Sequence, residues 1–189
     1  MLINFIGAPC SGKSTTAGRV YAELKDQGYP AEFVPEQARR YIAVNRYDSL
    51  DGLDQIVIME KQFKEESIFA EGSQTLVVAD SSPLNSLLYM TNGIRMTLDV
   101  EKVLGWLKER NESIPNVVFL CEPVKPALLL PDPNRLHTWE QSVALHGQIQ
   151  EILATYAPWV KPVVLVGDTK HRAQEALRTV FNKVYHADL

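Results

Sequence analysis

Cysteine is scarce in this sequence, because its 189 residues include only Cys10 and Cys121. Two thiols cannot form a disulfide framework, and neither lies in a C-x-x-C or Cys/His pattern that would bind zinc. The sequence also has no apolar run near the roughly 18 residues of a membrane-spanning helix, and no basic leader at its N-terminus. We therefore expect a protein of the reducing cytoplasm that makes no membrane contact.

Charge of one sign is not in large excess either, since the formal net charge is −4. This sum predicts no global attraction to nucleic acid or to an anionic membrane, although it is compatible with a local basic patch. Hydrophobic residues make up 46% of the chain and charged residues 22%, which is typical of a globular domain. We expect residues 1–189 to form a single domain whose core needs no disulfide or structural metal.

Short apolar runs alternate with stretches of helical periodicity, which is the pattern of βα units around a parallel sheet. Buried strands are predicted at residues 2–6, 31–34, 75–79, 117–121 and 162–166. Helices are predicted at residues 13–27, 36–44, 53–70, 84–90, 98–109, 138–156 and 169–184, with Thr138 as an N-cap. The pattern indicates an α/β fold of three layers, α/β/α, with a parallel sheet of about five strands.

The first predicted strand leads into a segment that fits the phosphate-binding pattern G-x-x-x-x-G-K-[ST]. With one further residue, the predicted nucleotide-binding segment comprises Gly7, Ala8, Pro9, Cys10, Ser11, Gly12, Lys13, Ser14 and Thr15. Lys13 is expected to reach the β- and γ-phosphates of ATP, and Ser14 to bind Mg²⁺ through its hydroxyl. A glycine-rich turn without a ligand is the alternative, which the agreement between motif and context disfavours. The sequence therefore predicts a P-loop NTPase.

An acidic residue, Asp80, directly follows the third predicted strand. Ligands of open α/β sheets bind beyond the carboxyl ends of the strands, so Asp80 is expected to face the same crevice as the P-loop. Two roles fit this place: holding Mg²⁺ through a bound water molecule, or accepting the proton of an attacking hydroxyl group. The alternative is that Asp80 only caps the following helix.

With these positions assigned, the chain resembles the ribosylnicotinamide-kinase-like family of P-loop proteins, an AAA-type family that includes many phage-encoded kinases. Residues 35–41, PEQARRY, are similar to the E-x-x-R-x-Y segment that lies over the acceptor substrate in that family. The resemblance implies that Glu36 and Arg39 contact the acceptor or a phosphate. Residues 80–82 are similar to the family's D-[TS]-x segment, which implies an acid/base or magnesium role for Asp80.

Two further segments extend the resemblance through the second half of the chain. Residues 132–135 resemble the family's D-G-x-R lid loop, with proline in place of glycine, which implies a catalytic Arg135 within a lid at about residues 123–137. Gly167 and Arg172 fit the family's G-x-x-x-x-R turn near the adenine, which implies that they contact the nucleotide. The alternative for both arginines is an ordinary surface charge, in the case of Arg172 on the first turn of a surface helix.

Together these features predict a kinase that transfers the γ-phosphoryl group of Mg·ATP to a hydroxyl of a nucleoside- or nucleotide-type acceptor. Lys13, Asp80 and Arg135 are the predicted catalytic residues, and Glu36 and Arg39 the predicted acceptor-binding residues. Because phage-encoded relatives phosphorylate a 5-hydroxymethyl pyrimidine within DNA, modified DNA stays open as an acceptor. The alternative is a regulatory P-loop ATPase or nucleotide switch without a small-molecule acceptor, which the Glu36 segment and the lid arginine disfavour.

Overall fold

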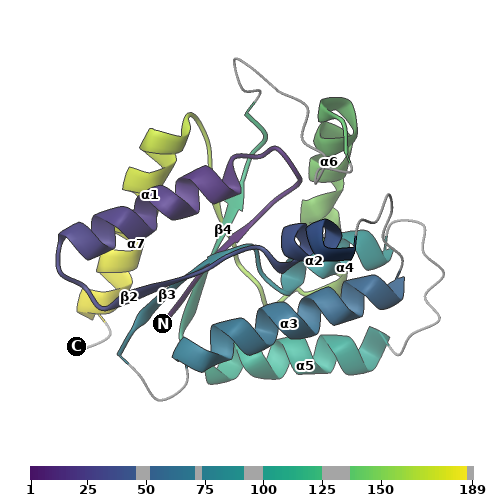
Figure 1. Ribbon diagram of the computed structural model, residues 1–189, viewed down its shortest axis with the longest axis horizontal. Helices are drawn as coiled ribbons and strands as arrows, with labels where there is room; N and C mark the ends of the chain where they lie inside the picture. The colour runs from purple at the N-terminus through teal and green to yellow at the C-terminus, as the bar shows by residue number, and fades with distance from the viewer. Residues whose placement is uncertain (46–51, 71–73, 92–99, 125–136, 187–189) are drawn as a thin grey trace.

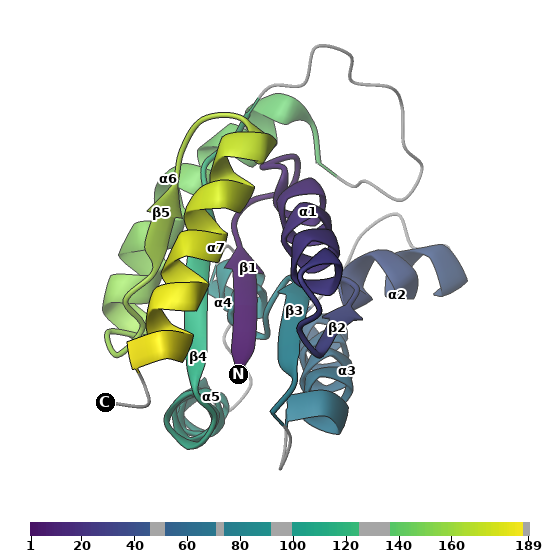
Figure 2. The same cartoon turned by 90° about the vertical axis from the view of Figure 1, so that its left-hand side faces the viewer.

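The computed structural model describes residues 1–45, 52–70, 74–91, 100–124 and 137–186. In these residues five strands form one parallel sheet: β1 (Leu2–Ile6), β2 (Ala31–Val34), β3 (Leu76–Asp80), β4 (Asn116–Cys121) and β5 (Val163–Leu165). Figure 1 shows the sheet among its helices, and Figure 2 labels all five strands, whose order is β2-β3-β1-β4-β5. The chain runs outward in one direction from β1 and in the other direction after β3, so the topological switch point lies between these two strands. The predicted fold class is confirmed.

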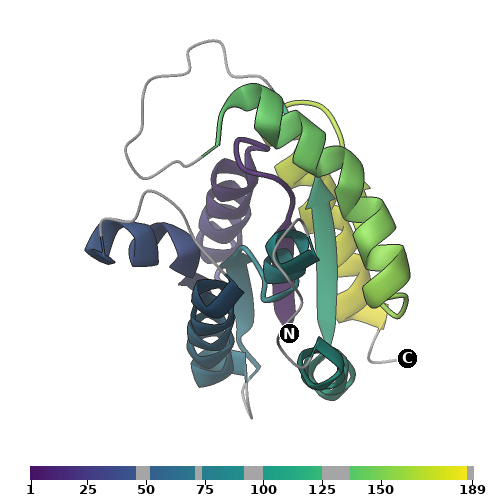
Figure 3. The same cartoon turned by 90° about the vertical axis from the view of Figure 1, so that its right-hand side faces the viewer.

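Helices cover both faces of this sheet. They are α1 (Lys13–Asp26), α2 (Gln37–Asn45), α3 (Gly52–Ala70), α4 (Leu84–Thr91), α5 (Val100–Ser113), α6 (Trp139–Tyr156) and α7 (Thr169–His186). Figure 2 shows α1 and α7 side by side over one face, and Figure 3 shows α3, α4, α5 and α6 over the other. The α2 helix follows β2 and packs against α3. Among the described residues, no helix is long and apolar enough to cross a membrane.

The central strands are buried on both faces, which explains why they appear in the sequence as continuous apolar runs. In β4, for example, Phe119 packs in the cluster under α1 and α7, whereas Leu120 packs in the cluster under α4 and α6. In β1, Phe5 stacks on Phe119 with ring centroids 5.3 Å apart. Alternate residues of each strand thus fill two separate cores, and the strand ends are fixed in register beneath the loops that follow them.

The predicted elements are all present, and they differ from the observed ones only at their ends. Thr138 is the N-cap of α6, as predicted, and its hydroxyl accepts the N–H of Gln141 at 3.2 Å in a capping box. The largest difference is α5, which runs four residues past its predicted end at residue 109, because Arg110 on its last turns is buried against α3. The predicted lid at residues 123–137 lies, apart from its two ends, outside the described residues.

Candidate nucleotide and acceptor site

The P-loop connects β1 to α1 at the carboxyl end of the sheet and contains several left-handed backbone positions. Gly7 has a φ of 144° and Gly12 a φ of 80°, and Cys10 also has a positive φ, of 60°. A side chain at Gly7 would come within 2.7 Å of the carbonyl oxygen of Cys121, so only glycine fits there. Such left-handed turns are typical of loops whose backbone N–H groups surround an anion.

Lys13 is held inside this loop rather than in solvent. Its Nζ donates hydrogen bonds to the carbonyl oxygens of Gly7 and Ala8, each at 2.9 Å, and its side chain is 7% exposed. The neighbouring Ser14 lies on the first turn of α1 and is exposed. An ammonium group in this position is ready to exchange its two carbonyl partners for the oxygens of a bound phosphate.

Asp80 ends β3 beside the P-loop, because it is the register partner of Phe5 at the end of β1. Its carboxyl group is buried, and burial raises its pKa above the ordinary value. A hydrogen bond from the Ser14 hydroxyl and the positive charges of Lys13 and Arg39 act against this rise in the pKa. The pKa of Asp80 is therefore influenced by residues of both the P-loop and α2.

The cap at the start of α4 comes from Ser82 and not from Asp80. The N–H of Leu84 is bound at 3.3 Å by the hydroxyl of Ser82, so Ser82 provides the cap. The Oδ1 atom of Asp80 is buried and has no hydrogen-bond partner among the described residues. A buried carboxylate oxygen without a partner is costly unless a ligand completes it, which favours a functional role over capping.

The donor set at this position fits Mg²⁺. Ser14 and Asp80 supply oxygen atoms, which a hard cation prefers, and the Ser14 hydroxyl is near enough to act on the pKa of the Asp80 carboxyl group. The described residues contain no group of three or more His, Cys, Asp or Glu side chains that could form a complete metal cage. In phosphoryl-transfer sites in general, Mg²⁺ takes most of its ligands from nucleotide phosphates and water.

Glu36, between β2 and α2, lies close enough to Tyr89 of α4 for its charge to act on the Tyr89 hydroxyl group. Burial, and then the negative charge of Glu36 and the nearby Cys10 thiol, raise the pKa of the Tyr89 hydroxyl well above its ordinary value. The ring of Tyr89 also lies 5.7 Å from the imidazole ring of His137, which directly precedes α6. Neither residue belongs to the motifs found in the sequence, so only the packing of α4 against the start of α6 brings the two rings together.

Arg39, the second predicted acceptor residue, lies one helical turn beyond Glu36 on α2 and is exposed. Its positive charge acts on the Asp80 carboxyl group and lowers the pKa of that group. The structure therefore brings Glu36 and Arg39 to the same end of the sheet as Lys13 and Asp80. Arg135, the predicted lid arginine, lies outside the described residues.

Arg172 differs most from its sequence-based alternative. It lies in the first turns of α7, but its side chain is fully buried, so the description as a surface charge is wrong. Its Nη1 donates to the carbonyl oxygen of Ser11 at 2.7 Å, whereas Nε and Nη2 have no partner among the described residues. It also lies beside Cys121, whose thiol has a pKa raised to about 11, first of all by burial. Arg172 thus stabilises the P-loop through a hydrogen bond to its backbone.

The predicted adenine turn joins β5 to α7. Gly167 has a φ of 83°, and Asp168 caps α7 by accepting the N–H groups of Lys170 and His171, each at 2.9 Å. These bonds lower the pKa of the Asp168 carboxyl group. A contact of Gly167 or Arg172 with a nucleotide stays a prediction, but both residues belong to a turn that abuts the P-loop, since a side chain at Gly12 would meet Thr169 at 3.2 Å.

Comparison with known proteins agrees with this geometry. Residues 2–172 match the model of a family described as an AAA domain. A crystal structure of the NadR protein in complex with NR is similar, with a TM-score of 0.68 and 18% identity over 94% of this chain and 50% of that chain. A second NadR structure, in complex with NAD and AMP-PNP, has a TM-score of 0.67 and 18% identity over 94% and 48%. The chain thus spans about half the length of these NadR proteins.

A structure of deoxyadenosine kinase from M. mycoides with bound dATP is similar over 98% of this chain and 100% of that chain, with a TM-score of 0.54 and 15% identity. No curated protein matches the sequence. At identities of 15–18%, these likenesses establish the fold, which is that of the P-loop kinases.

Proposed function

The chain belongs to the AAA-domain family, and we propose that it is an ATP-dependent kinase for a hydroxyl group of a nucleoside- or nucleotide-type acceptor. One observation carries the proposal: the buried Asp80 carboxyl group ends β3 beside the P-loop, and the Ser14 hydroxyl, Lys13 and Arg39 all act to lower its pKa against the effect of burial. A catalytic carboxylate between a phosphate-binding loop and a second charged segment is what phosphoryl transfer to an acceptor requires.

In the proposed reaction, the acceptor oxygen forms a bond to the γ-phosphorus while the bond from that phosphorus to the β,γ-bridging oxygen breaks. The proton of the attacking hydroxyl passes to Asp80 or, if Asp80 holds the metal, to water. Burial raises the pKa of Asp80, which makes its carboxylate a better proton acceptor than an exposed aspartate. Lys13 neutralises charge on the phosphates, and bound Mg²⁺ would add to this neutralisation from its place at Ser14 and Asp80.

The acceptor would lie between α2 and α4. Glu36 offers a carboxylate that can accept hydrogen bonds from sugar hydroxyl groups, and the neighbouring Tyr89 and His137 rings offer flat surfaces for a base. Proteins of the same fold have been solved with NR and with dATP, and this supports a nucleoside or nucleotide in this chain as well. The resemblance implies that Arg135 neutralises charge on the transferring phosphate, and this role stays part of the proposal.

A transfer assay with γ-labelled ATP tests the proposal. The acceptors are free nucleosides, nucleotides, and DNA that contains a 5-hydroxymethyl pyrimidine, and Lys13→Ala is the inactive control. Label on a nucleoside or nucleotide is the expected result, and label on the DNA alone would identify modified DNA as the acceptor. ATP hydrolysis that no acceptor stimulates would contradict the kinase and favour the regulatory ATPase.

The same assay tests the metal. Ser14→Ala removes one oxygen ligand, so we expect the Mg²⁺ concentration for half-maximal activity to rise while the protein stays folded. Ser14→Thr keeps the hydroxyl and is the matched control. Activity in the presence of a strong chelator would contradict a magnesium-dependent transfer.

A further inference from the structure

The first turn of α2 is held by a side chain from another helix. The N–H of Gln37, the first residue of α2, donates to the Oε1 atom of Gln62 on α3 at 3.1 Å, and this bond is buried. The side-chain amide of Gln37 donates in turn to the carbonyl oxygen of Pro35 at 3.0 Å. Helix N-termini have N–H groups without intrahelical partners, so the Gln62 side chain acts as a cap from a distance. Glu36 lies in the chain between Pro35 and Gln37, the two residues held by these hydrogen bonds.

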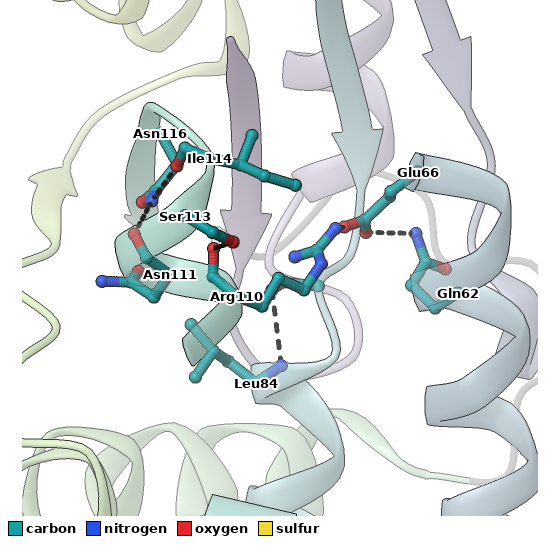
Figure 4. Close-up of polar contacts among 9 residues, drawn as sticks. Gln62, Glu66, Leu84, Arg110, Asn111, Ser113, Ile114 and Asn116 are labelled. Carbon is teal, nitrogen blue, oxygen red and sulfur yellow. Dashed lines mark hydrogen bonds and ion pairs between the residues drawn. The ribbon is translucent and has the colours of Figure 1, made fainter. Parts of the chain in front are cut away.

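Gln62 is itself oriented by a buried ion pair. Its Nε2 donates to Oε1 of Glu66 at 2.9 Å, and the other carboxylate oxygen of Glu66 pairs with Arg110 on α5 (Figure 4). Glu66 is 0% exposed and Gln62 3% exposed. An ionised carboxylate can only accept hydrogen bonds, so it selects the amide nitrogen of Gln62. The carbonyl end of the same amide must then point toward the N–H of Gln37.

We propose that Gln62 is a positioning residue for the acceptor, because the chain of contacts Arg110–Glu66–Gln62–Gln37 fixes the turn of α2 that carries Glu36 and Arg39. This inference rests on the proposed function, in which these two residues contact the acceptor. Both already act on site residues, since the charge of Glu36 raises the pKa of Tyr89 and the charge of Arg39 lowers the pKa of Asp80. A rotation of α2 would change both relations together.

The P-loop depends on other contacts, which gives the inference a selective consequence. Lys13 is bound to Gly7 and Ala8, and the carbonyl of Ser11 is bound by Arg172. Loss of the Gln62 contact should therefore disturb the acceptor and leave ATP binding in place. A residue that served stability alone would affect both substrates, or neither.

The experiment compares three variants by steady-state kinetics, with deoxyadenosine and NR as the probe acceptors. Gln62→Leu removes both hydrogen bonds and should lower kcat/KM for the acceptor by up to roughly 100-fold, while KM for ATP changes by less than about twofold. The double variant Gln62→Glu/Glu66→Gln exchanges the amide and the carboxylate, so that each hydrogen bond can form again. Because this exchange also moves the counter-ion of Arg110 from position 66 to position 62, activity is expressed per folded protein, and on that basis the double variant should recover most of the lost activity toward the acceptor.

Ile58→Val is the matched control. Ile58 lies on the same helix, is 5% exposed, and belongs to none of these hydrogen bonds. The smaller side chain lowers stability without touching the contact chain, so its kinetics should equal those of the wild type after correction for folded protein. Equal losses for ATP and acceptor in Gln62→Leu, or no recovery in the double variant, would overturn the positioning role.

Amide hydrogen exchange supplies a readout that needs no acceptor. In Gln62→Leu the amides of residues 37–39 should exchange faster than in the wild type, while those of α1 and β3 keep their rates. If the wild type phosphorylates no acceptor, the proposed function fails, and the exchange result still decides whether Gln62 holds α2. Unchanged exchange at residues 37–39 would overturn the inference even in an active enzyme.

Discussion

Charged side chains are buried in two places in this protein, and the two places differ in how many of the polar atoms have hydrogen-bond partners. Between α3 and α5, the Glu66 carboxylate is paired with Arg110 and bound by Gln62, so both of its oxygens have partners. At the carboxyl end of the sheet, one oxygen of Asp80 and two guanidinium nitrogens of Arg172 have no partner within the described residues. We call the first the closed network, because the protein provides partners for both oxygens of its carboxylate, and the second the incomplete network, because one oxygen of its carboxylate has no partner among the described residues.

The difference separates a structural role from a ligand-binding one. Buried polar groups normally have hydrogen-bond partners, so several incomplete groups around one loop indicate a place that a ligand completes. The α3–α5 network is not perfect either, since Nε of Arg110 and Oδ1 of nearby Asn4 lack partners among the described residues. Both of those residues line the same small pocket beneath α5 and the start of α4.

The largest expected effect comes from Asp80→Asn, which breaks the incomplete network. If Asp80 is the base, kcat should fall by roughly 10²–10⁴-fold. If Asp80 holds magnesium, much of the activity should return at high Mg²⁺ concentration. The measurement is kcat across a magnesium titration, and a fully active variant would remove Asp80 from the site.

Asp80→Asn should lower activity but raise stability near neutral pH. Burial raises the pKa of Asp80 in the folded protein, so the folded state favours the protonated carboxyl group. The stabilisation from this group is full below the ordinary pKa and is lost as the pH rises through the raised pKa. Asp80→Asn avoids that loss. Its melting temperature should therefore equal that of the wild type in acid and exceed it near neutral pH, and a lower value at neutral pH would contradict the prediction.

The next largest effect comes from breaking the closed network. Glu66→Gln leaves Arg110 buried without its counter-ion and should cost about 3–5 kcal/mol of folding free energy. The double variant Glu66→Leu/Arg110→Met removes both charges and should restore most of that stability. Chemical denaturation of the three proteins measures the difference. Equal stability of the single variant and the wild type would show that the pair contributes nothing.

The smallest expected effect concerns Arg172. Arg172→Met removes a charge-assisted hydrogen bond to the P-loop backbone and a positive charge behind the phosphates, so affinity for ATP should fall roughly 10-fold or somewhat more. The increase in melting temperature that ATP causes should shrink, and adenosine, which lacks phosphate, should show no such difference. Arg178→Met is the control, because Arg178 lies on the same helix with its side chain 73% exposed. An unchanged response to ATP in Arg172→Met would contradict the role.

Much of this molecule could be predicted from local patterns. The P-loop pattern, the apolar strands and the capping box at Thr138 depend on residues that are near each other in the sequence. Asp80 could be placed beside the P-loop because the ends of parallel strands meet at one edge of a sheet. The sequence also contains a signal for Gln62 and Glu66, because both lie on the buried face of α3 together with Met59. Polar residues at apolar positions indicate a buried polar contact, but they do not indicate which residues they bind.

The sequence by itself therefore determined the α/β class, the order of the elements and the phosphate-binding loop, because each follows from short-range periodicity and spacing. Tertiary structure alone decided which distant groups meet. Arg172 binds a carbonyl 161 positions earlier in the chain, and Gln62 caps a helix that begins 25 positions earlier. The exposed or buried state of such residues depends on how whole helices pack against the sheet. Because of that packing, Arg172 is buried and binds the P-loop instead of lying on the surface. For the same reason Gln62 binds the first turn of α2.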